Sequence, residues 1–387
     1  MATLLWICLG IIGYTFIGYG LILYCLVLIR RAIFGPRPLP VIANHMPSVA
    51  VVVAAFNEEN CISAKIENTL SLHYPGRVEY LFVSDGSTDS TPNIISKYSD
   101  IRLLHEPERR GKIAAMERAA AATDAEILVF TDANTILNRD ALLNICRHYR
   151  DASVGAVSGE KKVSTDGVAD ATAGEGFYWK YESKLKQWDS ELYTVVGAAG
   201  ELFSVRRCLY SPVPPDTILD DFIISMRIAE QGYRIIYEPA AYAAETASEN
   251  IREELKRKIR IAAGGIQSVM RLSAALNPFH NFLLSFQYVS HRVLRWLVTP
   301  FLLVLAFLVN LLIIVQTPSF SFMLLFFCQV AFYSLSILGL LLDRLHLRVR
   351  AFYIPYYFCM MNYAVVAGIR RYMLRQQTTL WEKAKRK

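Results

Sequence analysis

Long apolar stretches without a charged side chain lie near both ends of the chain and enclose a segment of mixed composition. Residues 2–29 form the first stretch, and residues 296–342 form the second. About 20 apolar residues are enough for a helix to cross a bilayer. The pattern therefore predicts a retained membrane helix at 1–30 and two more within 293–343, with a break at Gln316–Phe320.

A third uncharged stretch, residues 351–369, poses a problem of orientation. Basic residues follow the first predicted span within 30–37, and others gather in the C-terminal tail at 383–387. The positive-inside rule then places the N-terminus outside and the central segment in the cytosol, at the plasma (inner) membrane of a multi-pass protein. A full crossing at 351–369 would export the basic tail. We therefore expect an interfacial or re-entrant segment within 344–387, with a fourth span as the alternative.

The central segment, residues 48–249, alternates between strand and helix patterns. Apolar runs of strand length, each followed by a helical pattern, occur at residues 47–56, 78–84 and 126–131. Such alternation predicts an α/β domain on a mainly parallel, Rossmann-like sheet with helices on both faces. The alternation loosens after Val154, as expected of a second lobe. Residues 250–290 follow as basic, amphipathic helices that should lie on the bilayer surface.

Composition and charge narrow the class of partner. Of the 387 residues 53% are hydrophobic, and the formal net charge is +7. Because the basic residues cluster beside the apolar stretches, we expect them to face a lipid bilayer and not a nucleic acid. The seven cysteines have neither the spacing of a metal site nor that of a disulfide framework.

Polar side chains follow three of the predicted strands. Asn57 and Glu58 end the first, Asp85 ends the second, and Asp132 and Asn134 follow the apolar run at 126–131. Each could be only a helix cap or a turn residue. Ligands of open α/β sheets bind at the carboxyl edge, however, and these residues share that edge. Together they favour a binding site.

The chemistry of these residues points to a nucleotide and a cation. The Asp132 carboxylate and the Asn134 amide can offer two oxygens to Mg²⁺ or Mn²⁺, which would also hold a diphosphate. Asp85 can accept hydrogen bonds from a base or ribose, and Lys112 ends a basic loop at a helix start, which suits phosphate. Further along, Asp220–Asp221 supplies a carboxylate that could act as a base, or could cap a helix.

Six motifs, in this order and spacing, carry a resemblance to a known family. They are Ala55–Glu59, Val83–Asp89, Arg110–Lys112, Phe130–Asn134, Gly197–Phe203 and Leu219–Phe222. Between about Ser48 and Gly265 the chain resembles the family 2 glycosyltransferases, inverting enzymes with the GT-A (nucleotide-diphospho-sugar transferase) fold. The membrane layout is similar to the branch of cellulose, hyaluronan, chitin and poly-N-acetylglucosamine synthases. Thr379–Lys383 resembles a tail common in bacterial members.

The resemblance implies a role for each candidate residue. Asp221 would be the general base, and Asp132 with Asn134 would stand for the Asp-X-Asp metal motif. The implied donor-binding residues are Phe56, Asn57, Glu58, Asp85, Lys112, Asp132 and Arg260. The implied acceptor side comprises Gly200, Glu201, Asp220 and Trp188.

Two departures from the family pattern matter. The metal motif ends in Asn134 where the family has Asp. The Gln-X-X-Arg-Trp motif of processive synthases corresponds to Arg257–Ile261, which keeps the arginine as Arg260 and lacks the glutamine and tryptophan. The missing tryptophan argues against polymerisation of the hyaluronan or cellulose type. Arg257 and Lys258 could neutralise a diphosphate or could bind anionic lipid.

The sequence thus predicts a membrane-bound inverting glycosyltransferase of polysaccharide biosynthesis. It would transfer one sugar from a nucleotide-diphosphate sugar, by resemblance a UDP-sugar, to a lipid-linked or growing saccharide acceptor. The alternatives are a processive synthase that extrudes its product and a non-catalytic membrane scaffold of the same fold. A nucleotidyltransferase would need neither membrane spans nor Asp221. Homo-oligomers or other proteins of polysaccharide assembly could supply the additional helices that a channel requires.

Overall fold

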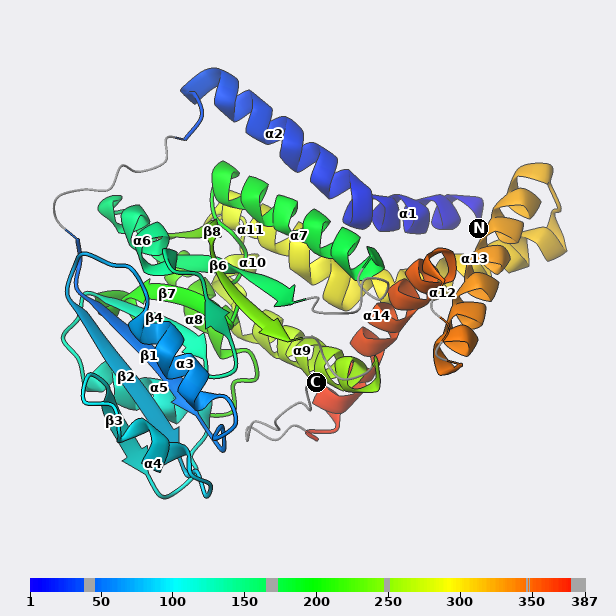
Figure 1. Cartoon of the computed structure of the whole chain (residues 1–387). Helices are drawn as coiled ribbons and strands as arrows, with labels where there is room; N and C mark the ends of the chain where they lie inside the picture. The colour runs from blue at the N-terminus through cyan, green and yellow to red at the C-terminus, as the bar shows by residue number, and fades with distance from the viewer. Residues whose placement is uncertain (38–45, 165–172, 247–250, 346, 348, 377–387) are drawn as a thin grey trace.

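The structure is a computed structural model in which residues 1–37, 46–164, 173–246, 251–345, 347 and 349–376 are described. The tail motif at 379–383 and the basic residues at 383–387 lie outside this part, as does the expected boundary between residues 249 and 250. Figure 1 shows a sheet with its helices on one side of the molecule and long helices on the other.

One eight-stranded sheet forms the centre of the domain, in the order β3-β2-β1-β4-β7-β6-β8-β5. The strands are β1 (Val49–Ala55), β2 (Val78–Asp85), β3 (Arg102–Glu106), β4 (Ile127–Asp132), β5 (Ile136–Leu137), β6 (Val154–Ser164), β7 (Leu202–Arg206) and β8 (Arg234–Thr246). Strands β1 to β4 are mutually parallel, as predicted. Strand β7 runs antiparallel to both β4 and β6, so the sheet as a whole is mixed.

Helices cover both faces of the sheet because its central strands are apolar on both sides. Successive residues of β1 enter different cores: Val51 joins the core under α3 (Ile62–Leu70) and α6 (Ala141–Cys146). Val52 joins the core under α5 (Lys112–Ala121) and α8 (Asp220–Glu230). Both side chains are almost fully buried. This two-sided burial explains why the sequence reads as a continuous apolar run. The short helix α4 (Thr91–Ile95) lies beside β2 and β3.

Four helical segments are long and apolar enough to cross a membrane. The first joins α1 (Ala2–Gly13) and α2 (Tyr19–Phe34) through a π-helical turn. The second joins α11 (Phe282–Tyr288), a π-helical stretch at Val289–Val298 and α12 (Thr299–Gln316). The others are α13 (Phe320–Arg344) and α14 (Arg350–Met373). Helix α1 packs against α12, whereas α2 packs against α7 (Ala173–Leu192) of the sheet domain.

Within the described residues 349–376 the expected segment is not a re-entrant hairpin, whereas an interfacial helix and a fourth span both stay predictions. The described residues form one continuous helix, α14, with Pro355 inside it. Pro355 lies in the second turn of α14, where it removes one backbone hydrogen-bond donor of the helix. The helix packs along α13 and along α9 (Ile251–Arg271), which hold it beside the sheet domain. Charge bias alone could not reveal these contacts.

Small residues of α9 allow three close approaches. A Cβ on Gly264 would lie 2.6 Å from the Leu219 side chain, directly before α8. A Cβ on Gly265 would lie 2.7 Å from the Trp296 ring, and one on Gly368 of α14 would lie 2.7 Å from the Cβ of Ala262. Helix α9, followed by the short α10 (Ser273–Leu276), therefore connects the start of α8 with the membrane helices.

Replacing Gly368 by Leu is expected to force α14 away from α9. The new side chain has no room, because backbone as well as side-chain atoms of α9 lie within 3.0 Å of its Cβ. Overpacking of this kind costs about 1–3 kcal/mol. Thermal unfolding in lipid nanodiscs measures the loss. Gly10→Leu is the matched control, since no atom lies within 4 Å of its Cβ. Equal unfolding temperatures for both variants would contradict the close contact.

Candidate active site

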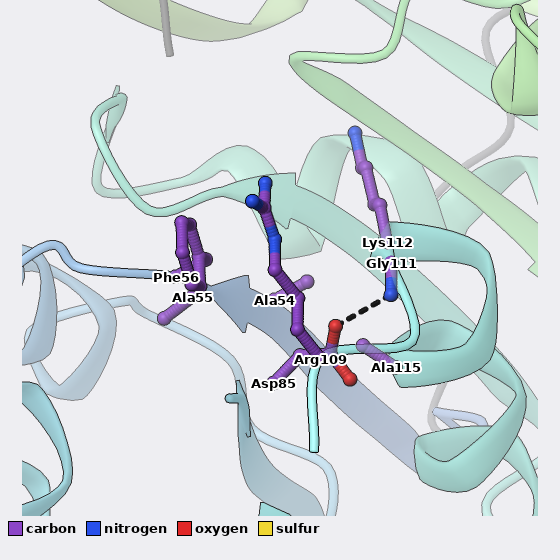
Figure 2. A pocket seen from close by; sticks show the side chains of 8 residues that line it. All are labelled: Ala54, Ala55, Phe56, Asp85, Arg109, Gly111, Lys112 and Ala115. Atoms are coloured by element: carbon purple, nitrogen blue, oxygen red, sulfur yellow. Dashed lines mark hydrogen bonds between the residues drawn. The ribbon is translucent and has the colours of Figure 1, made fainter. Parts of the chain in front are cut away.

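A pocket opens at the carboxyl ends of β1 and β2, on the predicted edge of the sheet. Its lining residues are Ala54, Ala55, Phe56, Asp85, Arg109, Gly111, Lys112 and Ala115. Figure 2 shows the Arg109 side chain lying against Phe56 and the Lys112 side chain reaching away from Asp85. The Arg109 guanidinium carbon is 3.6 Å from the centre of the Phe56 ring. A flat ring covered by a guanidinium can stack against a nucleobase.

Asp85 organises the loop that forms one wall of this pocket. Its Oδ2 accepts hydrogen bonds from the backbone N–H of Arg110 at 3.0 Å and of Gly111 at 2.6 Å. Its Oδ1 accepts one from Arg118 at 2.9 Å. Gly111 has a φ of +95°, which favours glycine. The structure therefore gives Asp85 a loop-positioning role, and a contact with the base remains a prediction.

Asn57 and Glu58 brace loops instead of lining the pocket. Asn57 has a φ of +53°, a conformation that asparagine tolerates, and its Oδ1 accepts a hydrogen bond from the Thr88 N–H at 2.8 Å. Glu58 is 2% exposed, and its N–H donates to the Thr91 hydroxyl at 2.8 Å. The sequence placed both correctly at the strand end. It could not show that the Asn57 side chain and the Glu58 backbone bind the neighbouring turn.

A lysine lies between carboxylates from two separate elements. Lys112, the first residue of α5, places its Nζ 2.8 Å from Oδ1 of Asp132 and 3.8 Å from Oδ2 of Asp220. Burial opposes the ammonium form, but the two carboxylates outweigh it and raise the pKa of Lys112 above its usual value. Lys112 is therefore a permanent cation at the point where the ends of β4 and α8 meet.

Asp221 is a carboxylate with an unusual proton affinity. Burial, and next the charge of Asp220, raise the pKa of Asp221 to about 7, although Lys112 opposes this. The alternative of a helix cap is wrong, because Leu219 is the N-cap of α8 and no side chain caps it. A Cβ on Gly200 would lie 3.1 Å from Oδ2 of Asp221, so the glycine leaves space beside the carboxylate. A group of this kind can accept a proton near neutral pH.

Comparison with known proteins identifies the domain. Residues 50–211 match the family model described as Glycosyl transferase family 2. This segment is a family 2 glycosyltransferase domain. Five of the six motifs lie inside the matched segment, which confirms the family resemblance there, whereas Leu219–Phe222 lies beyond it and its role stays a prediction.

Relatives with family 2 domains differ in the products that their names give. A beta-monoglucosyldiacylglycerol synthase of Nostoc sp. is 31% identical over 204 residues, which is 48% of this chain and 42% of the relative. A poly-beta-1,6-N-acetyl-D-glucosamine synthase of Staphylococcus aureus is 24% identical over 235 residues, 59% of this chain and 57% of the relative. The chain thus spans about half the length of the curated relatives it matches.

A solved structure shares the fold over nearly the whole chain. It is a mannosyltransferase from Pyrobaculum calidifontis in complex with GDP-Man and Mn²⁺. The TM-score is 0.71 at 24% identity, and the match covers 97% of this chain and 100% of that one. The predicted GT-A fold is thereby confirmed, and the four apolar helices are candidate membrane spans.

On the predicted acceptor side of the family 2 domain, charged residues neutralise one another. Lys161 pairs with Glu201 at 2.5 Å and also with Glu245. Arg257 pairs with Glu254 at 2.9 Å. Burial opposes the carboxylate form of Glu201, but Lys161 outweighs it and lowers its pKa. Arg257 is therefore already paired inside the protein.

The other basic residues of α9 have separate environments. Lys258 is 8% exposed, and its Nζ lies 3.4 Å from Glu254. It is therefore too buried to bind the anionic lipid that was one of its two predicted partners. Arg260 is partly exposed and makes no hydrogen bond or ion pair with any residue that the structure describes. Of the three basic residues, Arg260 keeps its predicted donor-binding role as a proposal.

Trp188 lies on the interface between α2 and α7, so the structure gives it a packing role, and its place on the acceptor side stays a prediction. Its ring centre is 5.0 Å from that of Tyr24 in α2. It packs with a cluster that contains Tyr19, Leu23 and Leu185. Aromatic residues at helical spacing in a surface helix serve packing more often than binding, and here the partner is the first membrane helix.

The residues that would hold a divalent cation alternate along the end of β4. Thr131, Ala133 and Thr135 are buried, whereas Asp132 and Asn134 between them are partly exposed. In the described part of the chain, no group of three or more His, Cys, Asp and Glu residues is arranged so that these residues alone could hold a metal ion. The buried Oδ2 of Asp220 nevertheless accepts no hydrogen bond from the described residues. One carboxylate, one amide and a spare carboxylate oxygen fit a hard cation that completes its coordination with diphosphate oxygens.

Proposed function

We propose that the protein is a membrane-bound inverting glycosyltransferase. It transfers a sugar from a nucleotide-diphosphate sugar to a lipid-linked or growing saccharide, in the assembly of a surface polysaccharide or glycolipid. The observation that carries the proposal is the convergence of Asp221, Asp220, Lys112 and Asp132 at the carboxyl edge of the sheet. The candidate base Asp221 and the Lys112 ammonium, which can bind a diphosphate, thereby lie together beside the pocket that we assign to the nucleotide.

The arrangement supports a single displacement. Asp221 takes the proton of the acceptor hydroxyl as that oxygen attacks the anomeric carbon and the bond to the diphosphate breaks. Lys112 and Arg260 supply positive charge toward the departing diphosphate. Mg²⁺ or Mn²⁺, held by Asp132 and Asn134, would neutralise further charge on that diphosphate. One displacement inverts the configuration and needs no covalent intermediate on the protein.

The position of α9 supports an acceptor that comes from the membrane. Gly264 packs against Leu219, next to the Asp220–Asp221 pair, and the same helix packs against α14. The carboxylates therefore lie one helix away from an apolar candidate span. We place the family 2 domain on the cytosolic side of the plasma (inner) membrane, because basic residues follow the first span. A bilayer-anchored acceptor would reach Asp221 without leaving the membrane surface.

A processive synthase is the second candidate, and the Staphylococcus aureus relative favours it through its name. Two features weigh against it. The segment Arg257–Ile261 lacks a tryptophan, and the described chain has four candidate spans. Either oligomers or partner proteins would have to complete a channel. The length of the product separates the two candidates.

The decisive experiment uses purified protein in lipid nanodiscs with a panel of nucleotide sugars and either Mg²⁺ or Mn²⁺. Release of nucleoside diphosphate and product length are followed with and without lipid-linked acceptors. A product with one added sugar supports the proposal, and a ladder supports the processive alternative. A protein that neither transfers nor hydrolyses with any donor would be a scaffold of this fold.

The pH dependence of transfer should follow the ionisation of Asp221. The base must be deprotonated, and the pKa of Asp221 in the free protein is raised to about 7. Below that pH, kcat/KM for the acceptor should rise about tenfold per pH unit, and above it the value should level off. A series from about pH 5 to pH 9 measures the profile. A flat profile in the acidic range would exclude Asp221 as the base.

A further inference from the structure

Lys65 is a fully buried lysine directly behind the predicted metal motif. It lies on the inner face of α3 with Ile62, Ile66 and Thr69, and it is 0% exposed. Within the described part of the chain it has no ion-pair partner within 4.0 Å. A buried ammonium without a carboxylate costs free energy unless other groups solvate it. Its place in the fold therefore calls for a function.

The Lys65 ammonium binds both ends of one short loop. Its Nζ donates to the Thr131 hydroxyl at 3.0 Å, to the Thr135 carbonyl at 2.9 Å and to the Thr135 hydroxyl at 3.4 Å. These two threonines flank the segment Asp132–Asn134. All three protons of the ammonium thus point to oxygens of the loop that carries the predicted metal ligands.

Further hydrogen bonds link the two threonines to the backbone of the predicted metal ligand Asp132. The Thr135 hydroxyl donates to the Asp132 carbonyl at 2.9 Å, and the hydroxyls of Thr131 and Thr135 are 3.1 Å apart. Thr131 also donates to the Glu201 carbonyl at 3.0 Å. Thr131 and Thr135 are buried, whereas Asp132 and Asn134, which lie between them, are partly exposed to solvent.

We propose that Lys65 is a positioning residue for the metal-binding segment: through Thr131 and Thr135 it fixes the loop so that the Asp132 carboxylate and the Asn134 amide present their oxygens to the cation. This inference rests on the proposed function of that segment. Lys65 touches neither the cation nor the donor, and acts only through the loop.

Electrostatics supports the same role. Burial lowers the pKa of Lys65 to about 7, while the negative charge of Asp132 opposes the decrease. The charge of Asp132 thus favours the ammonium form, which burial opposes. Residues behind metal ligands typically change metal affinity by about 10–100-fold when they are replaced, so the effect should be measurable.

The test measures binding of Mn²⁺ with GDP or UDP to the full-length protein in nanodiscs. Free Mn²⁺ is followed by electron paramagnetic resonance, which needs no turnover. Lys65→Met keeps the length of the side chain and removes the ammonium. Thr135→Val removes one of its partners and preserves the shape. Thr69→Val is the matched control, because its buried hydroxyl donates to the Lys65 carbonyl inside α3 and does not contact the loop.

We expect Lys65→Met to weaken Mn²⁺ binding by about 10-fold or more, and Thr135→Val to weaken it by a smaller factor. Thr69→Val should bind as the wild type does. If Lys65→Met does not fold, as judged by thermal unfolding, Thr135→Val decides the question. Wild-type affinity in the folded variants would overturn the inference and leave the proposed function intact. Absence of Mn²⁺ binding by the wild-type protein would overturn the metal site and the inference together.

Discussion

Replacing Asp221 by Asn is expected to reduce sugar transfer by about 10³-fold, because general base catalysis contributes about 10²–10⁴-fold. An amide cannot take the proton of the acceptor hydroxyl, whereas its size preserves the space beside Gly200. Binding of the nucleotide should remain close to that of the wild type, since the pocket is lined by other residues. Nucleoside diphosphate release in the presence of acceptor, together with a separate binding measurement, gives both quantities.

The control for this substitution is Asp124→Asn. The Asp124 side chain is fully exposed, and its one ion pair among the described residues is with Arg207 at 3.4 Å, so its loss should leave transfer unchanged. Asp221→Asn protein that transfers sugar at the wild-type rate would show that another group is the base. Asp220 would then be the next candidate.

The same substitution should make the protein more stable at high pH. A carboxyl group with a folded-state pKa raised to about 7 binds its proton more tightly in the folded than in the unfolded chain. Above the ordinary pKa of aspartate, ionisation therefore begins to destabilise the fold, and this cost is fully developed above about pH 7. Asn carries no such cost. The unfolding temperature of Asp221→Asn should exceed that of the wild type at alkaline pH and match it in acid.

The site residues at the strand ends could be predicted, because a polar residue directly after an apolar strand pattern marks where the strand ends. Asp85, Asp132 and Asn134 each follow an apolar run, and parallel strands bring such residues to one edge. The four parallel strands β1 to β4 bear this out. Lys112 was predicted from its position at a helix start. Its contact with Asp132 depends on how α5 and β4 pack, which no pattern in the sequence states.

Side-chain partners were harder to predict. Trp188 was placed on the acceptor side because the sequence cannot show that α2 folds back onto α7. Lys65 was missed, although it left a signal. In α3 the buried positions are Ile62, Lys65, Ile66 and Thr69, at the spacing of one helix face. A lysine at a position where the pattern demands an apolar residue indicates a buried polar partner.

A buried polar network joins the family 2 domain to the membrane helices. Glu182 of α7 pairs with Arg292 and Arg295 at 3.0 Å each, and lies 3.2 Å from Nε2 of His291. Nδ1 of His291 is 2.6 Å from Asp189, whose carboxylate also accepts a hydrogen bond from Tyr19 of α2. Both Glu182 and His291 are buried. Burial opposes the carboxylate form, but Arg292, His291 and Arg295 outweigh it and hold the pKa of Glu182 well below its usual range.

Glu182→Gln is therefore expected to cause the largest loss of stability among these variants. It removes the buried carboxylate that both guanidinium groups share, and breaking a buried pair from one side costs about 3–5 kcal/mol. A well-packed apolar replacement of the whole network could be neutral, so the loss arises from removing only the negative partner. Thermal unfolding in nanodiscs gives the size of the effect.

Local opening should accompany this loss of stability. Amide hydrogen exchange should increase in α2 and in the π-helical stretch at Val289–Val298, because both are held to α7 through the network. Glu108→Gln is the control, since its ion pair with Arg110 is exposed on both sides and contributes little to stability. If both variants unfolded at the same temperature, the network would not be what holds the membrane helices to the domain. Protection lost in α2 alone would assign the attachment to the Asp189–Tyr19 contact, and not to the arginines.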